Sequence, residues 1–246
     1  MKKNLRFWEI DSLRGIAIMM MIVFHFLFDL AYFGGYSFNV SSGFWLYFAR
    51  ATAAIFIFLV GVSLTISFSR VSKARSKGLF PKYLKRGLGI FACGMAITLI
   101  TWIFFRQEFI IFGVLHFIGI SIILAYPFIR WKYKNLAIGA ILIAAGLLLR
   151  NFTFNFQWLM WLGFVPKSLY TFDYFPLLPW FGVVMIGLFF GNMLYANGRR
   201  QFRIFSLPEK HAARFFSFLG RHSLLIYLVH QPLLILVFYL AGMARI

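Results

Sequence analysis

Apolar stretches of about 20 residues recur along the whole chain, and they constrain the fold more than any other feature. At a rise of about 1.5 Å per residue, each stretch is long enough to cross the roughly 30 Å hydrocarbon core of a bilayer. Of the 246 residues, 62% are hydrophobic and only 13% are charged, which excludes a soluble fold of this size. The sequence therefore predicts an all-α polytopic membrane bundle. The predicted spans, about seven in number, are 13–33, 44–68, 87–105, 109–129, 135–150, 176–196 and 219–241.

Lysine and arginine are distributed unevenly between alternate loops. If the N-terminus is cytoplasmic, 20 of the 25 cations fall on the cytoplasmic side, as the positive-inside rule requires. An odd number of spans then places the C-terminus outside. This topology accounts for the net charge of +19 without a nucleic acid partner. The basic loops can also attract anionic lipids or an anionic cytosolic cofactor.

No stretch of the sequence resembles a soluble domain, so residues 1–246 are interpreted as one membrane domain with membrane lipids as its surroundings. The single cysteine, Cys93, offers neither a disulfide nor a thiolate cluster, and we predict no metal site. The two halves show no repeat of the kind that marks many transporters. The sequence leaves the oligomeric state open, including a homo-oligomer.

Polar residues of the first span fall on one face of the predicted helix. Their spacing of three and four residues keeps the four polar side chains within a stripe of about 60°, which the two isoleucines between them widen to about 80°. His25 lies roughly 16 Å along the axis from Arg14, and therefore near the middle of the membrane. Asp29, one turn further out, is predicted to accept a hydrogen bond from His25. The alternative is that His25 has only a structural role and forms a hydrogen bond between helices. The stripe comprises Asp11, Arg14, Ile18, Ile22, His25 and Asp29.

The last span carries a second polar stripe, which contains Ser223, Tyr227 and His230, with Gln231 close by. Ionisable groups inside a membrane are costly and usually face a bundle interior or a water-filled cavity, so they are candidates for a functional site. Ordinary hydrogen bonds between helices are the alternative interpretation. Arg221 and His222 precede the stripe at its predicted cytoplasmic end.

Two further ionisable residues are ambiguous. His116 is flanked by Gly113 and Gly119, which permit close helix packing, so a packing role is as good an interpretation as a catalytic one. Asp173 precedes the sixth span on the outer side. It either orients an outer substrate or caps the helix that follows.

Several segments of the sequence resemble the heparan-α-glucosaminide N-acetyltransferase catalytic family, in particular its short prokaryotic members. The first is Arg6 to Ile18 with its Asp-x-x-Arg-Gly pattern, continuing to His25. Related membrane acyltransferases that O-acylate sugars begin with a similar pattern. Later segments that resemble the family, in the same order, are 113–119, 173–182 and 220–227 with His230.

The resemblance implies that an acetyl group passes from cytosolic acetyl-CoA to an amine or hydroxyl of a glycan or glycolipid on the outer side of a membrane, in a prokaryote the cytoplasmic membrane. Lysosomal members carry an asparagine at the place of His25, and their proposed catalytic histidine follows it. Here no histidine occurs between Asp29 and Arg50, so that acetyl-histidine mechanism does not carry over.

Direct transfer within a ternary complex is the hypothesis that remains. His25 would act as general base supported by Asp29, and His230 or His116 would polarise the thioester carbonyl. A cluster of basic residues at the cytoplasmic end of the bundle would bind the phosphates of the cofactor. Its candidate residues are Arg14, Arg221, His222, Arg86 and Lys82. Candidate substrate-binding residues are Asp173, Tyr227 and Gln231.

Two other functions use the same polar stripes. A transporter or flippase for a lipid-linked or anionic small molecule would line its path with them, although inverted repeats and paired broken helices would then be expected. A non-catalytic membrane subunit would keep the fold while another chain performs the chemistry.

Overall fold

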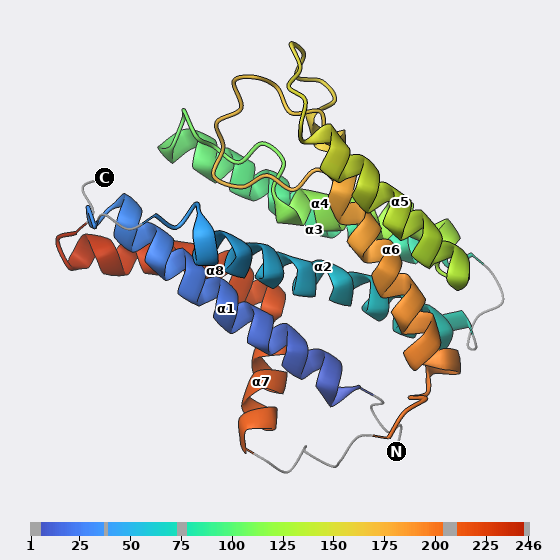
Figure 1. Cartoon of the computed structure of the whole chain (residues 1–246). Coiled ribbons are helices and arrows are strands. Elements are labelled where there is room, and N and C mark those ends of the chain that lie inside the picture. Colours follow the sequence, from blue (N-terminus) through green and yellow to red (C-terminus); the bar gives the residue numbers. More distant parts are fainter. Residues whose placement is uncertain (1–5, 37–38, 73–77, 204–210, 244–246) are drawn as a thin grey trace. The chain divides into compact units, whose positions relative to one another are not determined.

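The computed structural model describes residues 6–36, 39–72, 78–203 and 211–243. Within these ranges the chain forms eight α-helices and no strand longer than an isolated bridge, which confirms the predicted all-α fold (Figure 1). The helices are α1 Trp8–Tyr32, α2 Gly43–Ser72, α3 Phe80–Phe104, α4 Val114–Leu124, α5 Tyr133–Leu149, α6 Leu177–Leu194, α7 His211–Arg221 and α8 Ser223–Leu240.

Five of the described helices, namely α1, α2, α3, α6 and α8, are long and apolar enough to cross a membrane. The two other predicted spans correspond to shorter apolar helices, α4 and α5. With 11 residues, α4 extends only about 16 Å, and a short 3₁₀ turn, Tyr126–Phe128, follows it. The chain is therefore a polytopic helical membrane protein, whereas the number of crossings and the sides of the termini stay predictions.

The outward surface of α3 shows how a bilayer would cover this fold. Large apolar side chains on α3 are about half exposed, which a water-soluble protein rarely tolerates over such a length. Surrounding lipid removes this surface from water. The side chains are Leu88, Met95, Leu99 and Ile103.

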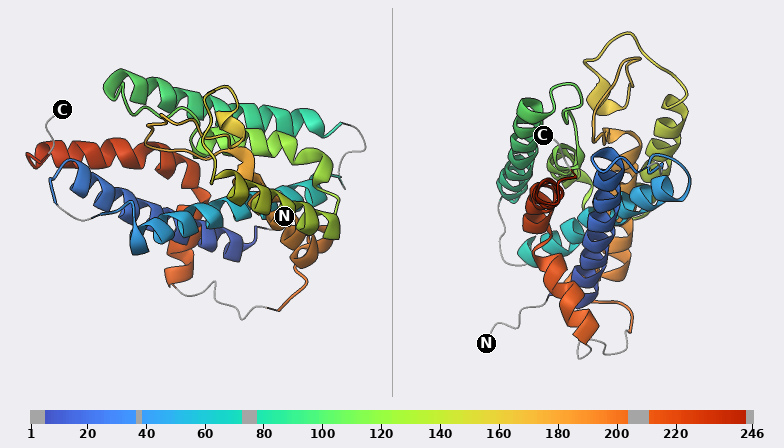
Figure 2. Two further views of the ribbon diagram at one scale, coloured as in Figure 1. Left: turned by 45° about the horizontal axis from the view of Figure 1, so that its top comes forward. Right: turned by 90° about the vertical axis from the view of Figure 1, so that its left-hand side faces the viewer.

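The chain divides into two compact units, residues 1–56 with 204–246 and residues 57–203. In the first unit, α1 packs against both α7 and α8 (Figure 2). The helix α7 was not predicted, because most of it lies in the segment between the predicted spans 176–196 and 219–241, whose five Lys and Arg residues favoured a cytoplasmic loop. Its face toward α1 contains Ser217 and Gly220, which are small and three residues apart.

The second unit holds two close helix pairs, α3 with α4 and α5 with α6. Glycines allow the backbones to approach at both crossings: Gly87 faces Gly119, and Gly139 faces Gly182. The prediction that glycines around His116 permit close packing is thereby confirmed at Gly119. The interpretation of the chain as one domain stays a prediction.

The crossing of α1 and α7 is sensitive to a single methyl group. A Cβ at Gly220 would collide with the carbonyl oxygen of Asp11, whereas a Cβ at Gly89 meets no atom within 4 Å. We expect Gly220→Ala to destabilise the protein by about 1 to 3 kcal/mol, as overpacking does. Thermal unfolding in detergent, with Gly89→Ala as the control, measures this effect. Equal unfolding temperatures for Gly220→Ala and wild type would contradict the crossing.

Candidate active site

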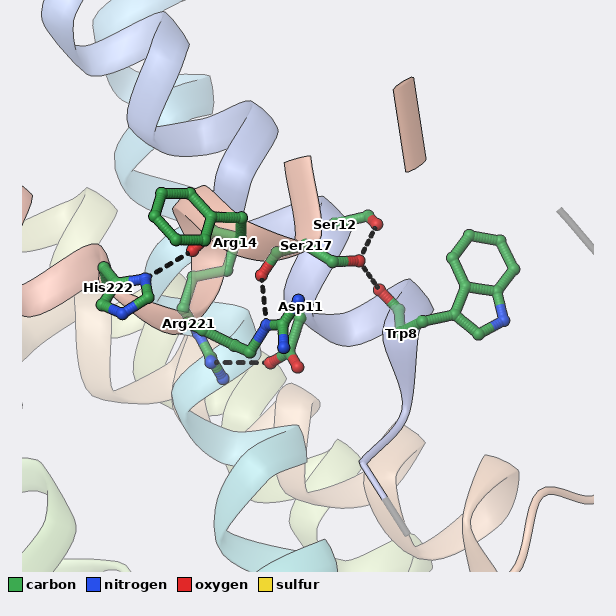
Figure 3. A network of polar contacts seen from close by, with 8 residues as sticks. Trp8, Asp11, Ser12, Arg14, Ser217, Arg221 and His222 are labelled. Carbon is green, nitrogen blue, oxygen red and sulfur yellow. Dashed lines mark hydrogen bonds and ion pairs between the residues drawn. The ribbon is translucent and has the colours of Figure 1, made fainter. Parts of the chain in front are cut away.

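The Asp-x-x-Arg-Gly pattern of α1 lies where α1 crosses α7. The hydroxyls of Ser12 and Ser217 are 2.8 Å apart, and Ser217 also donates to the carbonyl of Trp8 at 3.2 Å (Figure 3). A Cβ at Gly15 would collide with the carbonyl oxygen of Phe216. The glycine and the serine of this segment therefore serve close packing, and they leave the two charged residues at its surface.

Three of the predicted cofactor-binding residues gather at this end of the first unit. Nη1 of Arg14 contacts Oδ1 of Asp11 at 3.4 Å, and Nε of Arg221 donates to the carbonyl of Ser217 at 3.1 Å (Figure 3). Nδ1 of His222 lies 2.9 Å from the carbonyl oxygen of Phe218. Arg221 and His222 are exposed, so they can meet an anion from the surrounding solution.

The other two predicted cofactor-binding residues, Lys82 and Arg86, are exposed on the first turns of α3 in the second unit. Lys82 and Lys85 line a shallow cavity of about 560 Å³ together with Val71, Gly78, Leu79 and Pro81. The start of α3 therefore offers cations beside an open hollow.

His25 of α1 and His230 of α8 form a pair within the first unit. Their ring centroids are 4.8 Å apart, edge to face. Nδ1 of His25 lies 2.9 Å from the carbonyl of Met21, and Nδ1 of His230 lies 2.7 Å from the carbonyl of Tyr227. Because a carbonyl only accepts hydrogen bonds, each Nδ1 carries the proton. In the neutral rings, both Nε2 atoms therefore keep a lone pair and can act as bases.

The hydrogen bond predicted between His25 and Asp29 is not formed, which corrects the sequence-based expectation. Side chains in a helix point back toward its N-terminus, so the imidazole of His25 bonds to the preceding turn, at Met21. Asp29, only 1% exposed, instead accepts a hydrogen bond of 2.8 Å from Nε2 of Gln231 on α8. This bond links the two stripes directly.

Three buried polar atoms around these residues have no hydrogen-bond partner among the described residues. They are Oδ2 of Asp29, Nε2 of His230 and Oε1 of Gln231. Buried polar groups are nearly always paired, so these three atoms are the ones that a water molecule or a polar substrate group would be expected to satisfy. Tyr227, whose ring centroid is 5.6 Å from that of His230, borders the same region.

Both ring nitrogens of His116 have partners within the second unit. Its Nδ1 accepts the amide proton of Gly113 at 3.3 Å, so the proton of the neutral ring is on Nε2. That Nε2 lies 3.3 Å from the hydroxyl of Thr98, which itself donates to the carbonyl of Ile110 at 2.6 Å. With both ring nitrogens used, these bonds favour the packing alternative. The catalytic role of His116 stays a prediction.

Asp173 caps a helix, but a different one from the helix predicted. Its Oδ2 accepts the amide proton of Val114 at 3.0 Å, and so it caps α4, 59 residues earlier in the chain. The following helix, α6, has Pro176 at its N-cap position instead. Burial raises the pKa of Asp173 to about 6, against the opposing effect of the Val114 amide. Its substrate-orienting role stays a prediction.

Long apolar helices with a histidine pair between two of them, His230 buried and His25 half-buried, define a polytopic membrane protein with polar groups inside it, as membrane-embedded enzymes have. The family described as heparan-alpha-glucosaminide N-acetyltransferase, catalytic, matches residues 6–232, and the chain belongs to this family. Membership confirms the resemblance and implies a membrane acetyltransferase. Comparisons with curated proteins and with solved structures gave no match.

Sequence reasoning missed Ser217, which bonds to both Ser12 and Trp8. Its signal was the spacing of three that Ser217 and Gly220 share with Ser12 and Gly15. Two small pairs with equal spacing are typical of helices that pack closely.

The raised pKa of Asp173 makes stability depend on pH. Below pH 4 the carboxyl is protonated in both folded and unfolded chains, and between about 4 and 6 only the folded chain holds the proton. This stabilising contribution is lost as the pH rises through 6. The free energy of unfolding of Asp173→Asn, relative to that of wild type, should therefore rise by on the order of 1 to 2 kcal/mol between pH 5 and pH 7. Unfolding temperatures that keep a constant difference across this range would contradict the raised pKa.

Proposed function

We propose that this chain transfers the acetyl group of cytosolic acetyl-CoA to an amine or hydroxyl of a glycan or glycolipid at the outer side of a prokaryotic cytoplasmic membrane. The observation that carries the proposal is the pair of His25 and His230, whose hydrogen bonds to backbone carbonyls leave basic Nε2 atoms beside unpaired buried acceptors. Membership of a membrane acetyltransferase family supports the class of reaction.

Acetyl-CoA would approach the start of α1 and the junction of α7 and α8. Its phosphates are anionic, and guanidinium groups bind phosphate through several hydrogen bonds at once. Arg221 and His222 are exposed there, and Arg14 is held by Asp11 alongside them. Lys82 and Arg86 of α3 are the second group of candidates.

The chemistry supported by the histidine pair is direct transfer. The amine or hydroxyl of the acceptor attacks the thioester carbonyl while an Nε2 of the pair takes its proton. The new bond joins the acceptor nitrogen or oxygen to the acetyl carbon, the carbon–sulfur bond breaks, and the proton passes to the departing thiolate of CoA. No acyl-enzyme is required.

The hydrogen bonds also refine the expected role of His230. A neutral His230 has its only N–H engaged with Tyr227, so it cannot polarise a carbonyl until it gains a second proton. Two positive charges on rings 4.8 Å apart would repel each other. The pair therefore holds at most one extra proton, and either histidine can receive it.

Asp29, Gln231 and Tyr227 would bind the acceptor. The unpaired Oδ2 of Asp29 and Oε1 of Gln231 can each accept a hydrogen bond from a hydroxyl or an amine. Their mutual bond fixes which oxygens remain available. A substrate-orienting role of Asp173 is a separate hypothesis, which concerns the second unit alone.

Calorimetry of acetyl-CoA binding tests the cofactor part of the proposal. Wild-type protein in detergent should bind with an affinity on the order of micromolar, and Arg14→Ala should weaken binding about tenfold, because a phosphate contact is lost. His25→Ala should leave binding nearly unchanged. No binding by folded wild type would exclude an acetyl-CoA-dependent enzyme and favour a transporter.

Transfer assays test the histidine pair. With membrane vesicles, radiolabelled acetyl-CoA and glucosamine as the probe acceptor, His25→Gln and His230→Gln should each slow transfer about 100-fold or more, as loss of a general base does. His211→Gln, at the exposed start of α7, is the matched control and should keep the wild-type rate. Wild-type rates in both variants would contradict a catalytic role for the pair.

A further inference from the structure

The connection between α5 and α6 folds into a small lobe of its own. This segment, residues 150–176, is called the aromatic lobe below. Phe154, Phe156 and Phe164 form its core, with ring centroids 4.9 to 6.0 Å apart. Backbone bonds join Phe154 to Val165 at 3.0 Å and to Lys167 at 3.2 Å. The lobe therefore has packing and hydrogen bonds of its own, which fix the positions of its side chains.

Several aromatic side chains of the lobe face outward. Trp158 is 72% exposed, and its ring rests on that of Phe156 at 5.6 Å. Nε1 of Trp161 donates to the carbonyl of Trp158 at 2.9 Å, which holds the turn that presents both rings. Tyr170 and Phe152 are 74% and 60% exposed. Exposed aromatic clusters of this kind mark binding surfaces.

Neutral hydrogen-bonding residues alternate with the aromatic residues from 151 to 158. Asn151, Thr153, Asn155 and Gln157 are all exposed, and residues 151–166 contain no charged side chain. Amides can donate to and accept from the neighbouring hydroxyls of a sugar, while an aromatic face packs on the apolar C–H face of a sugar ring. This combination is complementary to an uncharged carbohydrate.

A lipid-facing role would require a different pattern. Aromatic belts lie at the ends of spanning helices, where lysine and arginine often accompany them. The aromatic lobe instead loops away from the end of α5, with Trp158 nine residues beyond Leu149 (Figure 1). The charged residues of the lobe are Arg150, Lys167 and Asp173, all outside residues 151–166. Residues 151–158, which carry the outward aromatic and amide groups, therefore offer no cation to an anionic headgroup or an acidic glycan.

We propose that the aromatic lobe binds an uncharged glycan chain, stacking a sugar ring on Trp158 while Asn155 and Gln157 bond to its hydroxyls. The inference rests on the proposed function and deepens it, because it names a neutral glycan as the acceptor held on the outer side. The lobe lies in a different part of the chain from the histidine pair, so binding and chemistry can be tested separately.

Tryptophan fluorescence of the full chain in nanodiscs tests this proposal without acetyl-CoA. The signal of Trp158 is the difference between wild type and Trp158→Phe. Probes are the uncharged trimer of N-acetylglucosamine, a glucose hexamer, a mannose trimer and, as an acidic comparator, a heparin hexasaccharide. A second set of nanodiscs contains brominated lipids, which quench tryptophans at the bilayer.

At least one neutral probe should change the Trp158 signal saturably, and Trp158→Ala should weaken its binding about tenfold. Asn155→Ala should weaken it by a smaller factor, and Trp102→Phe, at another exposed tryptophan, should not weaken it. A response to heparin alone, or to no saccharide, would overturn the proposal, and quenching by brominated lipid in the second case would identify a membrane anchor. Since acetyl-CoA is absent throughout, calorimetric failure of cofactor binding would count against the acetyltransferase alone.

Discussion

The backbone approach of α1 to α7 is the constraint on which the first unit depends. At Gly15 and Gly220 the two helices come so close that no side chain fits between them, and the hydroxyls of Ser12 and Ser217 bond across the crossing. Because α8 follows α7 after only one residue, His222, this crossing also determines how α8 meets α1. Contacts near the start of α1 therefore also bring His230 of α8 next to His25 of α1.

Within the apolar surroundings of α1 and α8, backbone carbonyls decide what the histidines can do. A carbonyl of the same helix holds each Nδ1 proton, so each Nε2 is left as a base. Gln231 occupies one oxygen of Asp29 and leaves the other unpaired. His116 has the opposite arrangement, with both nitrogens engaged, which is what a packing histidine requires. Hydrogen bonding thus separates histidines that look equivalent in the sequence.

Hydropathy and spacing predicted the membrane fold and the two polar stripes because both depend on local periodicity. The stripes of His25 and His230 do meet, as faces of adjacent helices can. Partner choice could not be predicted: the 3.6-residue period brings Asp29 near His25, but it says nothing of Gln231, 202 residues away. The cap that Asp173 provides to α4 has the same long-range origin. The helix α7 was missed because it lies mostly in a segment between two predicted spans, and its few small residues were a weaker signal than the basic residues around them.

Nitrogen NMR of ¹⁵N-labelled histidine rings in nanodiscs tests the account most directly, with signals assigned through His25→Gln, His230→Gln and His116→Gln. At neutral pH, the account predicts that His25 and His230 carry their proton on Nδ1 and that His116 carries its proton on Nε2. Protons on Nε2 of His25 and His230 would contradict it, because neither ring would then offer the base on which the proposed transfer depends.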